Sequence, residues 1–112
     1  MQTISMGLIR VPTPGTPVRV CSDESLNVVM MVIRTVPGFT GKTYVGLTGM
    51  DKHTANKTGV VRILSEPPAF GPQDGEVFPA YPSGQSNVIR PADFWVDADV
   101  AGEGVMVTCY VA

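Results

Sequence analysis

The sequence predicts an all-β protein: an antiparallel β-sandwich or small barrel, jelly-roll or immunoglobulin-like, with about seven or eight short strands. Its apolar residues fall in short runs that alternate with period two, as strands with one buried face require. Ten prolines and twelve glycines separate these runs and mark turns. With 112 residues, no repeat and no linker, the chain is expected to form a single sandwich domain over residues 1–112.

The first half of the chain supplies four of the expected strands. Residues 3–11, "TISMGLIRV", form an extended segment, and the loop Pro12–Pro17 after it is too rich in proline to be helical. The density of Val, Met and Ile in "LNVVMMVIR", residues 26–34, predicts a central strand. Two shorter runs complete this half, "VRVC" at 18–21 and "TYVGLTG" at 43–49.

The second half is less regular. The segment "MDKHTANKTG", residues 50–59, is polar and is expected to be a solvated loop tip, followed by a strand in "VVRILS", residues 60–65. Residues 66–87 contain five prolines and leave room for only one short strand around Val77.

The C-terminal stretch, residues 94–111, alternates strictly and predicts a β-hairpin whose turn is Ala101-Gly102-Glu103-Gly104. Trp95, Asp97 and Asp99 would share its outer face with Met106, Thr108 and Tyr110, as a solvated or partner-facing surface. The ligand pattern argues against a calcium loop of the EF-hand type. Counting from Asp97, the fifth position is Ala101 and the twelfth is Thr108, where oxygen ligands are needed.

Four aromatic residues are candidate interface residues. Phe70, Phe78 and Tyr81 fall in the proline-rich segment, and Trp95 stands on the polar face of the expected hairpin. Aromatic side chains are enriched at protein interfaces, so some of these rings could anchor a partner. The alternative is that the rings cover the open end of the core.

The composition excludes several classes of function. Only 16% of the residues are charged and 44% are hydrophobic, so a partner is expected to cover part of the surface. The net charge is -2 and the eight basic residues are scattered, which argues against a nucleic-acid partner. No apolar run is long enough for a membrane helix, and no secretion signal is present, so a cytoplasmic setting with Cys21 and Cys109 reduced is expected.

No catalytic or metal-binding constellation stands out. His53 is the only histidine, and "GKT" at 41–43 lacks the first glycine of a phosphate loop because position 36 is Val36. Asp97 and Asp99 could in principle pair as acid and base on a sugar, which leaves a small glycan-active enzyme as a third possibility. We expect no enzymatic activity, no cofactor and no metal.

Three stretches resemble the small all-β decoration or cement proteins of tailed-bacteriophage heads: "GTPVRV" (15–20), "VIRTVPGFTGKTYVGL" (32–47) and "ADFWVDADVAGEGVMVTCYV" (92–111). The last stretch is similar to the "dlyVDgdvdGdGVtvtY" ending of such proteins. These motifs are structural, and the longer proline-rich segment, residues 66–87, departs from the usual pattern.

The resemblance implies a virion protein, assembled in the host cytoplasm, that binds the outer surface of the major capsid protein lattice and stabilises the head. Its implied partners are the major capsid protein and neighbouring copies of itself, with a trimer as one candidate assembly. The alternative is a tail or fibre adhesion module that binds host glycans through aromatic platforms and carboxylates.

Overall fold

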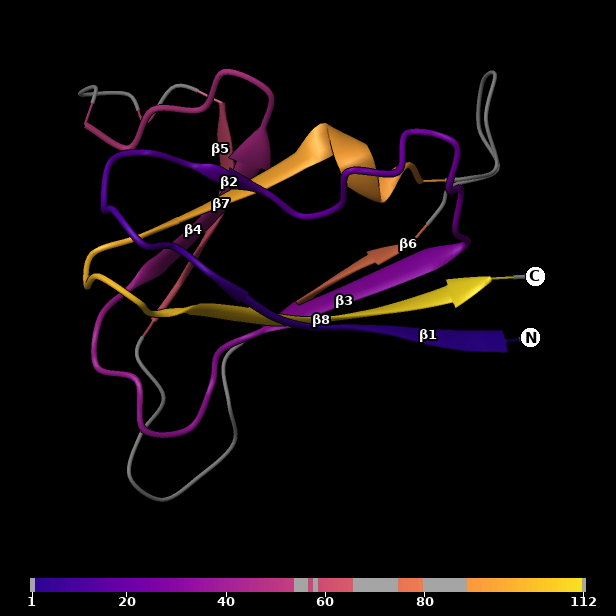
Figure 1. Ribbon diagram of the computed structural model, residues 1–112, viewed down its shortest axis with the longest axis horizontal. Coiled ribbons are helices and arrows are strands. Elements are labelled where there is room, and N and C mark those ends of the chain that lie inside the picture. Colours follow the sequence, from indigo (N-terminus) through magenta and orange to yellow (C-terminus); the bar gives the residue numbers. More distant parts are fainter. Residues whose placement is uncertain (1, 54–56, 58, 66–74, 80–88, 112) are drawn as a thin grey trace.

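Two antiparallel four-stranded sheets pack face to face in the computed structural model, which describes residues 2–53, 57, 59–65, 75–79 and 89–111 (Figure 1). The expected all-β sandwich is confirmed. The only described helical element is the single 3-10 turn η1 (Pro91–Asp93). No helix among the described residues is long and apolar enough to cross a membrane.

The first sheet contains the longest strands. Its order is β1 (Gln2–Arg10), β8 (Gly104–Val111), β3 (Met30–Arg34) and β6 (Gly75–Pro79). The strand β3 lies between β8 and β6, which confirms the central strand predicted within residues 26–34. A β-bulge between Ser5 and Gly7 interrupts the pairing of β1 with β8.

The second sheet is shorter. Its order is β2 (Val18–Arg19), β7 (Phe94–Ala98), β4 (Thr43–Leu47) and β5 (Val60–Leu64). In the register, Val96 lies between Val45 and Val18, and Asp97 lies beside Tyr44. Because side chains alternate across a strand, the valines face inward and Asp97 faces outward.

The core fills the space between the sheets and draws on both. The first sheet contributes inward side chains that are almost fully buried, including Met31, Ile33 and Val107. The second sheet contributes Val45 and Val96. Branched aliphatic side chains at alternating strand positions therefore form one continuous core, as the period-two pattern predicts.

The predicted C-terminal hairpin is wrong. Strand β7 belongs to the second sheet and β8 to the first, so the turn after Asp99 carries the chain across the sandwich instead of joining paired neighbours. Gly102 has φ +83, which supplies the positive φ expected of a turn glycine. The alternating pattern of residues 94–111 is compatible both with a hairpin and with strands in opposite sheets. In each case every strand buries one face against the same core.

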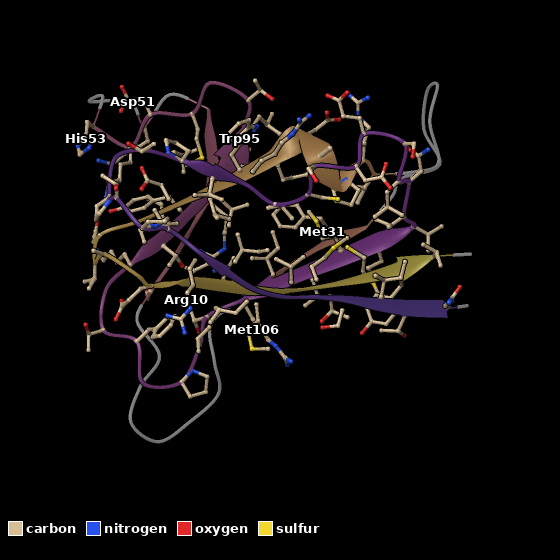
Figure 2. The ribbon with its side chains drawn as sticks, in the orientation of Figure 1. Arg10, Met31, Asp51, His53, Trp95 and Met106 are labelled. Atoms are coloured by element: carbon tan, nitrogen blue, oxygen red, sulfur yellow. The ribbon has the colours of Figure 1, made fainter. Side chains whose placement is uncertain are left out.

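This arrangement separates the side chains that were expected to share one outer face. Trp95 and Asp97 lie on the outward face of the second sheet, whereas Met106, Thr108 and Tyr110 lie on the outward face of the first. In Figure 2, Met31 lies between the two sheets, Trp95 lies beside the second sheet, and Met106 points away from the first. The protein therefore has two different outward faces.

Candidate functional site

Asp97 is a structural carboxylate, although the sequence predicted a solvated or partner-facing position. It is fully buried because the loop that contains Gly15 passes over it. Its Oδ1 accepts hydrogen bonds from the backbone N–H groups of Gly15, at 3.0 Å, and Ala98, at 2.7 Å. Its Oδ2 has no hydrogen-bond partner among the described residues. Asp97 thus ties the loop between β1 and β2 to the outward face of the second sheet.

Asp99 takes part in a second polar contact on the same side. The Lys52 Nζ donates to Asp99 Oδ1 at 3.0 Å and to the Ala98 carbonyl at 2.5 Å, and the Tyr44 hydroxyl donates to Asp99 Oδ2 at 3.1 Å. The ammonium group lies 5.2 Å from the centre of the Tyr44 ring. Burial, followed by the hydrogen bond to Asp99, raises the pKa of Tyr44. These contacts hold the loop after β4 against the sheet.

Part of that loop was expected to be a solvated tip, and the structure corrects this expectation. Met50 and Lys52 are buried, whereas His53 is exposed as predicted. Met50 can be buried because Gly46, which has no side chain, leaves room for it beside β4. A Cβ on Gly46 would lie 2.9 Å from the Met50 side chain and 2.5 Å from the Gly59 carbonyl oxygen.

Glu103 is the third acidic residue with a structural role. Its carboxylate accepts hydrogen bonds from the backbone N–H groups of Thr40, at 2.9 Å, and Gly41, at 2.8 Å. The described residues contain no cluster of three or more His, Cys, Asp or Glu side chains that could hold a metal ion. The acidic residues of the C-terminal stretch therefore fasten loops to the sandwich.

A small apolar pocket opens on the outward face of the second sheet, and Trp95 forms one wall. Its volume is about 240 Å³, and its lining consists of Pro17, Thr48, Gly49, Met50 and Trp95. The Trp95 Nε1 donates to Thr48 Oγ1 at 3.2 Å, and the Arg19 guanidinium lies 5.9 Å from the indole centre. These contacts position the ring beside the second sheet (Figure 2).

The rest of the pocket comes from a turn and a loop that the sequence did not mark as functional. The Met50 N–H donates to the Leu47 carbonyl at 3.0 Å, and Gly49 has φ +85, so residues 47–50 form a tight turn. Gly46 lies directly beside Trp95 in the register. Because Gly46 has no side chain, it leaves open space beside Trp95 on the neighbouring strand. The sequence alone does not reveal this, because it does not show that β4 pairs with β7.

The structure describes two of the four predicted interface residues. Phe70 and Tyr81 lie outside the described residues. Phe78 lies on β6, and its ring centre is 5.1 Å from that of Phe94, where both rings pack against the core. This placement favours the alternative that the Phe78 ring covers the core, and the prolines around it do not prevent β6 from pairing with β3. Trp95 lies at the pocket.

No protein-family model, curated protein or solved structure matches this chain.

Proposed function

We propose that this chain is a non-enzymatic structural protein of a virus particle, a capsid decoration protein that binds the outer surface of the major capsid protein lattice. The observation that carries the proposal is the Trp95 pocket. It presents an aromatic ring and two apolar neighbours, Pro17 and Met50, at the surface of a rigid sheet. Buried apolar anchors that enter such pockets dominate the binding energy of protein interfaces.

The size and polarity of the pocket favour a protein partner. Ligand sites for small molecules usually have volumes of about 300–1,000 Å³, and this pocket measures about 240 Å³. A single apolar side chain projecting from a partner is the better match. Leu47, which precedes the pocket residue Thr48, is 44% exposed and extends the apolar area.

The polar groups around Trp95 already have partners within the chain. The Arg19 guanidinium donates to the Ala92 carbonyl and to Glu24, and the indole N–H donates to Thr48. A glycan needs donors and acceptors beside the ring it stacks on. A fibre module that binds host glycans is therefore the weaker alternative, and it would use Trp95 as a platform for a sugar ring.

The structural carboxylates add a second argument. Because Asp97 and Asp99 hold the two loops that border the pocket, little conformational entropy would be lost on docking. Many copies on a closed lattice would also make a modest contact effective through multivalency. A pocket whose bordering loops are held in place suits a protein that binds in many copies to a large shell.

The test is co-sedimentation of purified protein with capsids that lack it. We expect the wild type to sediment with the particles and Trp95→Ala to lower its occupancy by about tenfold or more, as loss of a central anchor predicts. Phe39→Ala is the matched control, because this half-buried ring lies against Arg10, away from the pocket. It should sediment like the wild type.

Both variants must melt within a few degrees of the wild type for the comparison to count. A wild-type protein that stays in the supernatant rejects the capsid assignment. Binding to a glycan array that is lost in Trp95→Ala would support the fibre alternative instead.

A further inference from the structure

Two loops form the walls of the Trp95 pocket. Pro17 ends the loop between β1 and β2. The loop after β4 supplies Thr48, Gly49 and Met50. Because β7 lies between β2 and β4 in the sheet, the two loops reach Trp95 from its two sides. The width of the pocket therefore depends on how these loops are placed relative to each other.

The two loops meet where the imidazole of His53 lies over Gly15. A Cβ built on Gly15 would lie 2.8 Å from the His53 Nε2 and 3.6 Å from its Cδ2. Figure 2 shows His53 at the edge of the molecule, beside the loop between β1 and β2. Gly15 also has φ +93, a conformation that residues with a side chain rarely adopt. The ring can occupy this place because position 15 is a glycine.

A carboxylate fixes each side of this contact to the sheet. The Gly15 N–H donates to Asp97 Oδ1 at 3.0 Å. On the other side, His53 directly follows Lys52, whose Nζ donates to Asp99 Oδ1 at 3.0 Å. The contact of His53 with Gly15 thus joins two loops that the sheet already holds separately.

We infer that His53 is a positioning residue of the pocket, because its ring links the two loops and so sets the spacing between Pro17 and Met50. Gly15 lies two residues before Pro17. His53 lies three residues after Met50. Over such short segments, loss of the contact changes the position of both pocket walls. The value of this spacing for a partner rests on the proposed function, whereas its effect on the pocket is a property of the isolated chain.

The exposure of His53 makes a positioning role separable from a role in stability. Substitutions of exposed side chains usually change the stability of a fold very little, and His53 is exposed. Trp95 is the only tryptophan of the chain, so its fluorescence reports the surroundings of the pocket directly. A change in that fluorescence without a change in melting temperature therefore identifies a positioning residue.

Acrylamide quenching of the Trp95 fluorescence in the purified chain tests the inference. We expect His53→Ala to raise the quenching constant about twofold, because a loop that opens locally exposes more of the indole. Its melting temperature should stay within a few degrees of the wild type. His53→Phe keeps a flat ring over Gly15 and should be quenched like the wild type. Thr13→Ala, at an exposed position of the same loop, is the matched control and should also be quenched like the wild type.

Gly15→Ala approaches the same contact from the other loop. Its methyl group would displace the imidazole, so the quenching constant should rise as in His53→Ala. His53→Ala alone decides the test if Gly15→Ala does not fold, since φ +93 is strained for alanine. A folded His53→Ala that is quenched like the wild type, or a His53→Phe that is quenched as strongly as His53→Ala, would overturn the inference.

Co-sedimentation with capsids separates this inference from the proposed function. If the wild type binds, His53→Ala should lower its occupancy several-fold, since a displaced wall weakens the fit around a central anchor. A wild type that does not bind, together with the increased quenching of His53→Ala, would reject the proposed function and leave the positioning role of His53 intact.

Discussion

Glu103 Oε1 lies 2.8 Å from the backbone nitrogen of Gly41, although 62 residues separate them in the chain. The same carboxylate reaches the N–H of Thr40 at 2.9 Å. The contact joins the turn between β7 and β8 to the loop between β3 and β4. Glu103 therefore has a structural role, because backbone N–H groups donate to both of its carboxylate oxygens.

We expect Glu103→Ala to lower the free energy of unfolding by about 1–3 kcal/mol, because it leaves two partly buried N–H groups without an acceptor. Chemical denaturation monitored by circular dichroism measures this. Glu103→Gln retains one side-chain oxygen as acceptor and should lose less. Equal stability of Glu103→Ala and the wild type would show that water replaces the carboxylate at no cost.

Asp97→Ala should be destabilising to a similar or greater degree, since the carboxylate is fully buried and holds Gly15 and Ala98. We expect a loss of about 2–3 kcal/mol, typical of a buried hydrogen-bonded charge. Asp97→Asn preserves the Oδ1 acceptor and should be milder. Limited proteolysis within residues 12–17 gives an independent readout, because the alanine variant should be cleaved there faster than the wild type.

A chelator should leave the melting temperature unchanged. Protein donors reach Oδ1 of Asp97 and the carboxylates of Asp99 and Glu103, and the described residues contain no group of three or more side chains that could hold a metal ion. Thermal melts with and without EDTA make the comparison. A drop of several degrees on chelation would contradict the structural role assigned to these residues.

Cys109 should be unreactive in the folded protein. Burial on β8 raises the pKa of its thiol to about 11, with a smaller contribution from Cys21. Only about one molecule in a thousand would then be thiolate at pH 8. Alkylation followed by mass measurement should modify Cys21 but not Cys109 under native conditions, and both after unfolding in the absence of reductant. Failure of both to react in the unfolded chain would instead indicate a disulfide.

The raised pKa of Cys109 also predicts a pH dependence of stability. The unfolded thiol ionises near pH 9 and the folded one near pH 11, so its contribution is present below pH 9 and is lost as the pH rises toward 11. Unfolding curves at pH 8 and pH 10.5 should show a smaller decline for Cys109→Ala than for the wild type. All other groups are the same in both proteins, so the difference isolates the thiol.

Several strands could be read directly from the chain. Alternating apolar residues predicted β1, β4 and β5, and the dense run before Arg34 predicted the central strand β3. Local periodicity suffices here because each strand buries one face against the same core. Trp95 was also found as a surface aromatic from its place in that alternation. Whether it binds a partner remains a prediction.

Other features depend on which strands are neighbours. The alternation of residues 94–111 is the same whether β7 and β8 pair or lie in opposite sheets, so the predicted hairpin was wrong. The burial of Asp97 depends on a loop from the other end of the chain passing over it. The sequence around Asp97, "VDAD" at residues 96–99, gives no indication of that contact.

The sequence by itself determined the class of fold, most strand positions and the scarcity of charge, because these follow from local pattern and composition. Tertiary structure alone decided that the acidic residues brace loops, that Pro17, Met50 and Trp95 line one pocket, and that Tyr110 and Arg34 share an outward face. The physical reason is that pocket walls and sheet faces are assembled from strands and loops far apart in the chain. The alternating pattern of a strand determines which residues point to the same side of the sheet. The order of the strands and the path of the loops determine which groups each side contacts.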